Sequence, residues 1–175
     1  MSDSSIYSIG HGNKDIKQFL SELQAFQINY LLDVRSKPYS RWNPQFNKKF
    51  IEKTLNKHGI SYAFFGHLLG GIPEDPSCYD DKGAVVYSKI KEKEFFRKGM
   101  QRLLNANIKG IRIALMCSES NPQHCHRTKL IGTELLTREN ISVGHIISIN
   151  NYKSQETVMR EITGNQGTID FFGDE

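Results

Sequence analysis

The feature that most constrains the fold is a short apolar run at residues 111–116, Ile-Arg-Ile-Ala-Leu-Met, which leads directly into a cluster of reactive side chains. Such a run is typical of a strand covered on both faces, as in a parallel sheet. Leu130, Ile131 and Leu135 then recur at helical spacing, and Asn121-Pro122 is a good helix start. Ligands of open α/β sheets bind at turns between a strand and a helix. The sequence therefore predicts a functional site at this turn.

Other short apolar segments alternate with helical stripes along the chain. The additional strands are expected at residues 6–9, 30–34, 60–65 and 141–147. Strands that alternate with helices form βαβ units with right-handed crossovers. We therefore predict an α/β fold: one Rossmann-like three-layer sandwich with a mainly parallel sheet of about five strands. Residues 1–150 form this domain, and residues 151–175 are a C-terminal tail or extension with one weak helix.

Composition and charge limit the protein classes that fit. A chain of 175 residues suits one domain, and its net charge of +4 is compatible with an anionic partner. The polar start lacks the apolar core of a signal peptide, and no apolar stretch could span a bilayer, so we expect a cytoplasmic protein without a membrane partner. Three cysteines, an odd number, argue against a disulfide framework. No dinucleotide or P-loop pattern is found, and no cofactor is predicted.

Chemically active side chains follow several of the expected strands. They include His11, Asp33, Arg35, Cys117 and Glu119. In a parallel sheet the carboxyl ends of the strands share one edge, so these side chains are expected to converge there. The alternative for Asp33 and Arg35 is an ordinary salt bridge.

The turn after residue 116 combines two thiols, a carboxylate, two imidazoles and a guanidinium. A helix start favours anions, so Cys117 is predicted to be a thiolate nucleophile or a wall of an anion site, with Arg127 contacting the anion. A metal site on Cys117, Cys125 and His126, with Glu119 as a further ligand, is an alternative. Buried structural thiols and a redox-sensitive pair are the others.

Residues 35–49 have a different character, since five cations interleave with Tyr39, Trp42 and Phe46. Cations and aromatic rings together suit phosphate contacts with base stacking. The alternative is a basic loop whose rings anchor it to the core.

Taken in order, these pieces resemble the domain of unknown function 488 family. The matching segments are Ser8–Gly12, Leu32–Ser36, Pro38–Arg41, Asn43–Phe46, Leu69–Gly71, Met116–Glu119, Cys125–Arg127 and Val143–Ile146. The resemblance covers residues 6–147 and implies a compact α/β sandwich. It implies no particular reaction.

A weaker likeness is to rhodanese-type and cysteine-phosphatase folds. In those folds an Asp-Val-Arg ends an early strand, a nucleophilic cysteine ends a later one, and an arginine follows in an anion-binding loop. Here the loop between Cys117 and Arg127 is longer, lacks their glycine and carries an extra Cys-His. Sulfur transfer or dephosphorylation is therefore not carried over.

The leading hypothesis is an enzyme with a phosphate pocket at the carboxyl edge, acting on a nucleotide or nucleic acid. It assigns catalysis to four residues: Cys117, Glu119, Asp33 and His11. It assigns ligand binding to eight more: Gly10, Arg35, Arg41, Gly70, Gly71, Cys125, His126 and Arg127. The alternatives are a non-catalytic nucleotide or nucleic-acid binding module and a metal-binding protein. Residues 168–172 faintly resemble a clamp-docking peptide, which predicts a protein partner for the tail; the alternative is a terminal plug on the core.

Overall fold

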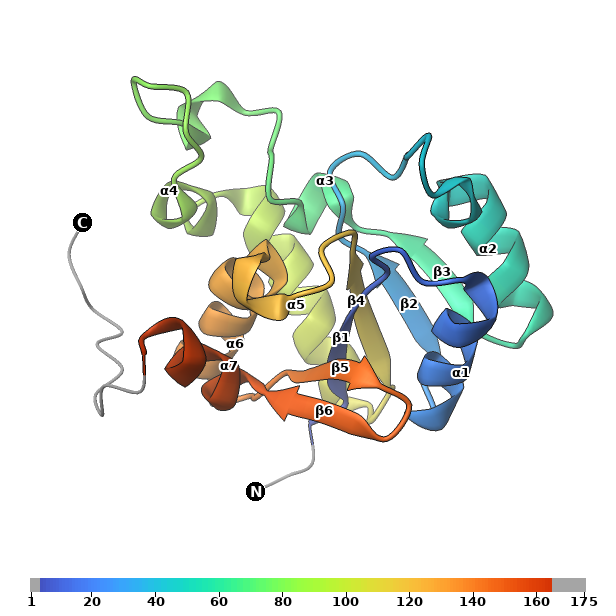
Figure 1. The fold of residues 1–175 in the computed structure, drawn as a ribbon. Helices are drawn as coiled ribbons and strands as arrows, with labels where there is room; N and C mark the ends of the chain where they lie inside the picture. The colour runs from blue at the N-terminus through green and yellow to red at the C-terminus, as the bar shows by residue number, and fades with distance from the viewer. Residues whose placement is uncertain (1–3, 165–175) are drawn as a thin grey trace.

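The computed structural model describes residues 4–164, which form a six-stranded sheet with helices on both faces (Figure 1). The strands are β1 (Ile6–Gly10), β2 (Tyr30–Asp33), β3 (Ser61–Phe64), β4 (Ile113–Cys117), β5 (Gly144–Ser148) and β6 (Asn151–Ser154). Their order is β3-β2-β4-β1-β5-β6. The first five are parallel, and β6 is antiparallel to β5. The predicted α/β sandwich with a mainly parallel sheet is thus confirmed.

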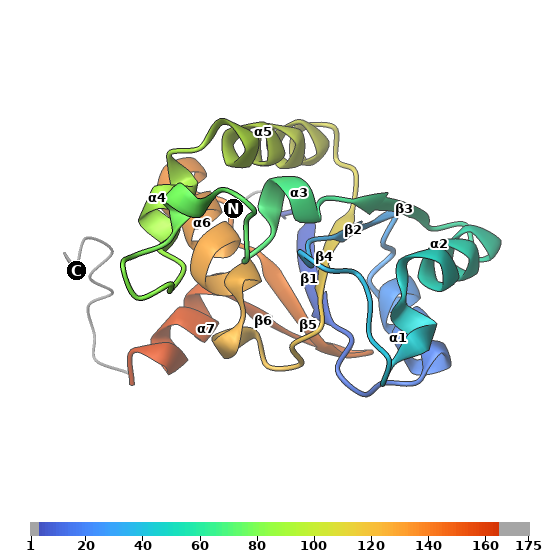
Figure 2. The same ribbon diagram turned by 90° about the horizontal axis from the view of Figure 1, so that it is seen from above.

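The helices lie in two layers, which Figure 2 shows from above. They are α1 (Ile16–Ala25), α2 (Lys48–Lys57), α3 (Gly66–Leu69), α4 (Tyr87–Lys91), α5 (Glu94–Ile108), α6 (Thr133–Glu139) and α7 (Gln155–Ile162). Asp15 caps α1 by accepting a hydrogen bond from the Gln18 amide. Gly59, two residues after the end of α2, has a positive φ of 73°, which suits a glycine that ends a helix.

Two apolar cores lie between the sheet and the two layers of helices, one on each face of the sheet. One core packs α1 and α2 against Leu31, Ala114 and Met116 of the sheet. The other packs α3, α5 and α6 against alternate residues of the same strands, including Leu32 and Leu115. Because successive strand residues point to opposite faces, each strand supplies both cores, as the continuous apolar run of β4 predicts.

The chain after β4 is less regular than a single helix. Pro122–His124 form one 3₁₀ turn that the Asn121 side chain caps, and Cys125 is extended. A π-helical turn at Arg127–Gly132 then continues into α6. The predicted helix start at Asn121-Pro122 therefore begins only a 3₁₀ turn, and Arg127 lies at the start of the π-helical turn. Wide turns of this kind are frequent at functional sites.

The segment after residue 150 extends the sheet. Tyr152 of β6 pairs with Ile146 of β5, and Val158 of α7 is fully buried. Up to residue 164, the segment predicted as a tail thus packs with the domain. The proposed docking peptide at residues 168–172 lies outside the described residues. Within residues 4–164, no helix is long and apolar enough to cross a membrane.

Candidate functional site

The predicted site residues gather at the carboxyl edge of β1, β2 and β4, but on two opposite faces of the sheet. Cys117 follows Leu115 on the face covered by α5 and α6. Asp33 follows Leu31 on the face covered by α1 and α2. The edge therefore carries two groups of side chains, which we describe in turn as the arginine pocket and the thiol cluster.

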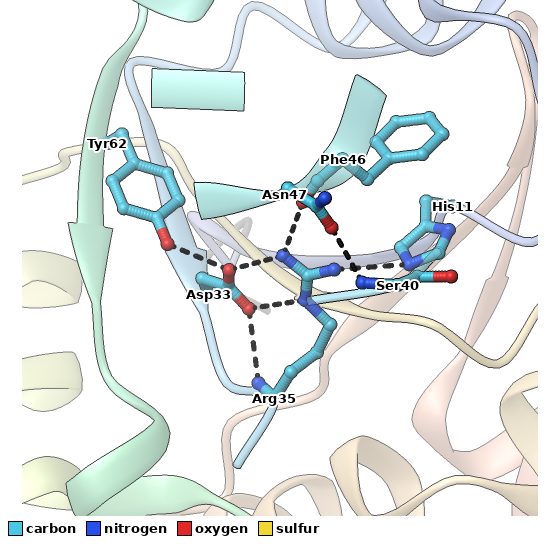
Figure 3. Close-up of polar contacts among 7 residues, drawn as sticks. All are labelled: His11, Asp33, Arg35, Ser40, Phe46, Asn47 and Tyr62. Carbon is cyan, nitrogen blue, oxygen red and sulfur yellow. Dashed lines mark hydrogen bonds and ion pairs between the residues drawn. The ribbon is translucent and has the colours of Figure 1, made fainter. Parts of the chain in front are cut away.

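The arginine pocket is built on the buried ion pair of Asp33 and Arg35 (Figure 3). The Nε and Nη2 atoms of Arg35 donate to the two carboxylate oxygens of Asp33 over 2.8 and 2.7 Å. Nη2 also donates to the carbonyl oxygen of Phe46 over 2.7 Å. These contacts fix the plane of the guanidinium and leave Nη1 pointing away from the carboxylate.

Asp33 has no acceptor capacity left for a substrate. In addition to the guanidinium, its carboxylate accepts the Arg35 amide over 3.2 Å and the Tyr62 hydroxyl over 2.8 Å. Its side chain is fully buried. Burial, together with the charge and hydrogen bond of Asp33, raises the pKa of Tyr62. Asp33 and Arg35 therefore form the salt bridge that was the alternative prediction for this pair. In this ion pair Asp33 positions Arg35.

His11 borders the pocket in a fixed orientation. Its ring stacks on Phe46 with centroids 4.4 Å apart, and Nδ1 donates to the Gly12 carbonyl over 2.9 Å. Nε2 therefore carries the lone pair and accepts a hydrogen bond from Nη1 of Arg35 over 3.4 Å. Burial and the charge of Arg35 lower the pKa of His11, against the opposing effect of the hydrogen bond to Gly12. The environment thus favours the uncharged ring, whose Nε2 acceptor is engaged by Arg35.

A polar cavity of about 400 Å³ opens beside these groups. His11, Arg35 and Glu119 are the predicted site residues that line it. The remaining lining, most of which was not predicted, comes from the loops after β1, β2 and β4: Gly12, Asn13, Lys37, Tyr39, Ser40, Asn43, Ser118 and Ser120. Their positions just after the predicted strands were the available signal.

The loop between β2 and α2 carries two exposed aromatic rings, one of which lines the cavity. Tyr39 lines the cavity and is 73% exposed, and Trp42 is 77% exposed. The guanidinium of Arg41 lies 4.5 Å from the centre of the Trp42 ring. Phe46, by contrast, is buried against His11 and Phe19. The anchoring alternative thus holds for Phe46, while the other two rings face solvent.

The thiol cluster lies on the other face and brings together Cys117, Cys125 and His126. The Nδ1 atom of His126 is 3.9 Å from Sγ of Cys117 and 3.8 Å from Sγ of Cys125. Nε2 of the same ring donates to the Val34 carbonyl over 3.1 Å, so Nδ1 faces both sulfurs. The hydrogen bond from Cys125 and the hydrogen bond and charge of His126 lower the pKa of Cys117, whereas the pKa of Cys125 is raised.

The three glycines that were predicted to bind a ligand allow neighbouring segments of the chain to approach closely. A Cβ on Gly10 would lie 2.0 Å from the Glu119 carbonyl oxygen, and one on Gly71 would lie 2.8 Å from Cγ of His126. A Cβ on Gly70 would meet the Gly66 carbonyl oxygen at 2.3 Å. Close approach of neighbouring segments therefore accounts for these glycines, and none of them lines the cavity.

Arg127 lies behind the loop that follows β4 and is fully buried. Its Nη1 atom donates to Ser8 Oγ over 3.0 Å, and Nη2 donates to the carbonyls of Glu119 and Ser120 over 2.7 and 3.2 Å. Within residues 4–164 Arg127 forms no ion pair, and the carboxylate of Asp33 pairs with Arg35 instead. The geometry makes Arg127 a support of this loop, outside the cavity lining.

Arg127 is also part of a buried chain of hydrogen bonds that includes His145, which does not line the cavity. Ser8 Oγ lies 2.6 Å from Nδ1 of His145, and Nε2 of His145 donates to Gln155 Oε1 over 2.7 Å. The amide of Gln155 then donates to the Thr128 carbonyl over 3.1 Å. His145 is a core residue whose ring nitrogens are both satisfied.

Comparison with known proteins agrees with the family resemblance seen in the sequence. The family model "Domain of unknown function DUF488" matches residues 15–133, about two thirds of the chain, and includes Asp33, Arg35 and the whole loop after β4. No curated protein and no solved structure matches significantly, so the likeness to rhodanese and cysteine-phosphatase folds stays a prediction. By the extent of the family match, the chain belongs to the DUF488 family, a domain of unknown function.

Proposed function

We propose that the arginine pocket binds the phosphate of a nucleotide, either a free nucleotide or one within a single strand, and that the protein acts on this ligand. The observation that carries the proposal is the juxtaposition of a polar cationic cavity with two exposed aromatic rings. Large exposed rings beside such a cavity fit base stacking, while cations fit the phosphate.

The phosphate contacts are assigned to Arg35 and Lys37. Asp33 and the Phe46 carbonyl hold the Arg35 guanidinium rigidly, so its Nη1 atom is preorganised toward the cavity. Lys37 is exposed and forms no ion pair within the described part of the chain, so its charge remains available. The hydroxyls of Ser118 and Ser120 supply further donors to phosphate oxygens.

Base stacking is assigned to Tyr39 and Trp42. A ring stacked on a base contributes about 1–3 kcal/mol per base. Arg41, which lies over the Trp42 ring, adds a positive charge close to where a strand would pass. The predicted ligand-binding role of Arg41 therefore concerns the rim of the pocket.

Proton transfer is assigned to His11 and Glu119, the imidazole and the carboxylate among the lining residues. The Nε2 lone pair of His11 accepts from Nη1 of Arg35, and a bound phosphate that draws Nη1 to itself would free this lone pair to accept a proton from a ligand hydroxyl or water. Asp33 is saturated and positions Arg35. Cys117 is not among the lining residues, so the proposal gives it no role in this pocket.

Trp42 makes a direct test possible, because it is the only tryptophan in the chain. The protein is titrated at low salt with inorganic phosphate, a nucleoside monophosphate and a short single-stranded oligonucleotide. Both base-bearing ligands are expected to quench Trp42 emission, with an affinity that falls as salt rises. Absence of quenching and of any heat of binding with all three ligands would exclude the proposal.

Two lysine variants separate pocket binding from general charge. Lys37→Ala is expected to weaken binding about tenfold, the effect of losing one charge-assisted hydrogen bond of roughly 1.5 kcal/mol. Lys109→Ala removes the same charge from an exposed site just after α5, at the opposite edge of the sheet, and is expected to have little effect. Equal losses in the two variants would indicate nonspecific attraction instead. Turnover is followed in parallel, and Glu119→Gln should abolish it without loss of binding.

A further inference from the structure

We propose that Cys117, Cys125 and His126 bind a divalent metal ion of the zinc class, with the fourth coordination position open. This site lies on the face of the sheet opposite the arginine pocket and is independent of the function proposed for that pocket. Within residues 4–164 these three side chains form the only group of three or more His, Cys, Asp or Glu donors close enough to share an ion.

The distances from His126 to the two sulfurs are close to those of a tetrahedral site. Zinc binds sulfur at about 2.3 Å and imidazole nitrogen at about 2.0 Å, which puts neighbouring donors roughly 3.5–3.8 Å apart. Here Nδ1 of His126 lies 3.9 and 3.8 Å from the two sulfurs, and all three donors fall within 4.8 Å of one another. Movements of about 1 Å or less would therefore bring them around one ion.

The orientation of His126 is the second observation. Nε2 donates to the Val34 carbonyl at the end of β2, so in the neutral ring the lone pair of Nδ1 points at both thiols. A histidine that binds a metal through one nitrogen commonly donates its other N–H to a carbonyl or a carboxylate, which fixes the tautomer. The Val34 carbonyl supplies this outer contact.

The backbone brings the three donors together from one short segment. Cys117 ends β4, the 3₁₀ turn at Pro122–His124 reverses the chain, and the extended Cys125 presents its sulfur beside that of Cys117. Gly71 covers the His126 ring so closely that a Cβ there would lie 3.1 Å from Nδ1. The ring is thus held between a carbonyl and a glycine backbone.

The donor set selects the class of metal. Two thiolates and an imidazole suit zinc and other borderline or soft ions, whereas magnesium and calcium require oxygen ligands. Three protein ligands with one remaining position are typical of catalytic zinc sites, whereas structural sites have four. Glu119 lines the arginine pocket and is not part of the donor group, which corrects its inclusion as an alternative ligand.

Cobalt titration of the full-length, reduced, metal-depleted protein tests the site. One Co²⁺ per chain is expected to produce a thiolate-to-cobalt charge-transfer band and the visible bands of tetrahedral coordination, and Zn²⁺ should abolish both. Zn²⁺ should also protect Cys117 and Cys125 from alkylation by iodoacetamide, as identified by peptide mass spectrometry. A titration without a thiolate band, or thiols that react equally with and without Zn²⁺, would overturn the proposal.

The third cysteine provides a matched control. Cys78 is buried in the turn at Pro76–Cys78 and does not belong to the donor group. Cys78→Ser should bind cobalt like the wild type, whereas Cys117→Ser and Cys125→Ser should each lose the band. A loss of the band in Cys78→Ser together with a retained band in the other two would contradict the assignment.

Gly71→Ala keeps all three ligands and separates ligation from misfolding. Its methyl group would displace the His126 ring, so we expect cobalt affinity to fall by about 10–100-fold, the effect of disturbing an outer contact. Near-ultraviolet circular dichroism should show that this variant remains folded. Unchanged affinity in a folded Gly71→Ala protein would show that His126 is not a ligand.

Discussion

Arg35 and Arg127 invite comparison, because both are buried at the same edge of the sheet and both were predicted to bind phosphate. Arg35 forms a two-point ion pair with Asp33 and borders the cavity. Arg127 has only neutral partners, Ser8 and two carbonyls, and its Nε atom has no hydrogen-bond partner. The same residue type thus forms an ion pair beside a cavity on one face and supports a loop through neutral groups on the other.

The partners of an arginine that follows a strand depend on the face of the sheet on which its side chain lies. Asp33 and Arg35 are two residues apart along the extended end of β2, so both point to the α1 and α2 face. Arg127 enters from the opposite layer, where no carboxylate among the described residues pairs with it. A buried charge with neutral partners and a buried charge with a carboxylate should respond differently to mutation.

The largest expected effect is that of Asp33→Asn. This change leaves the Arg35 guanidinium buried without its counter-charge, which typically destabilises a protein by about 3–5 kcal/mol. Urea denaturation gives the free energy of unfolding. Glu94→Gln breaks the exposed pair with Lys98 and should change little, so equal effects of the two variants would refute the importance of the buried pair.

The pH dependence of the free energy of unfolding should reveal the cost of protonating His145, which is buried near Arg127. Burial lowers the pKa of His145 from 6.5 to about 4, partly offset by the Gln155 hydrogen bond, and the nearby Arg127 lowers it further. Below pH 6.5 the unfolded chain therefore binds a proton that the folded chain does not, so stability is complete above pH 6.5 and falls toward pH 4. The predicted loss is on the order of 3 kcal/mol.

The matched variant for this prediction is His145→Gln, which cannot take up the proton. Because His11 is shifted in the same direction, only the difference between the two proteins is assigned to His145. Unfolding free energies from pH 7 to pH 4 should fall less steeply in the variant. Parallel curves would mean that His145 is not the group that titrates.

The smallest expected effect is that of Arg127→Met. It removes the hydrogen bonds to Ser8, Glu119 and Ser120 but leaves no buried carboxylate without a partner. Glu119 and Ser120 are exposed, so water can donate to their carbonyls in place of the guanidinium. We expect a loss of about 1–3 kcal/mol, below that of Asp33→Asn. Added phosphate should raise the melting temperatures of variant and wild type equally. A variant that loses this protection would return Arg127 to the phosphate site.

Much of the fold was predictable from the apolar pattern. The runs at 111–116 and 30–34 form neighbouring strands that both cores cover, and their carboxyl ends meet as expected. Strand β6 was missed because Asn151–Ser154 has only Tyr152 as an apolar residue, and an edge strand needs no apolar run. The π-helical turn at Arg127–Gly132 was also missed, since its apolar spacing resembles that of an ordinary helix.

The sequence predicted the position of the candidate site at the carboxyl edge of the sheet. It did not predict that the arginine pocket and the thiol cluster lie on opposite faces. Asp33 pairs with Met116 in the parallel register, which puts Cys117 on the opposite face. A one-residue change of register would reverse this arrangement, and local sequence does not determine the register. The proximity of Cys117, Cys125 and His126 was among the sequence alternatives, whereas the saturation of Asp33 by Tyr62 depends on a residue from a separate strand.

The position of β1 in the sheet has a consequence for how the chain folds. Ser8 of this first strand pairs with Leu115 on one side and His145 on the other, so both neighbours are encoded late in the sequence. During synthesis β1 must wait for β4 and then β5, while Ile6 and Ile9 lack their final packing. Folding is therefore expected to be slow and to conclude with the pairing of β5, after which the local hairpin with β6 covers the edge.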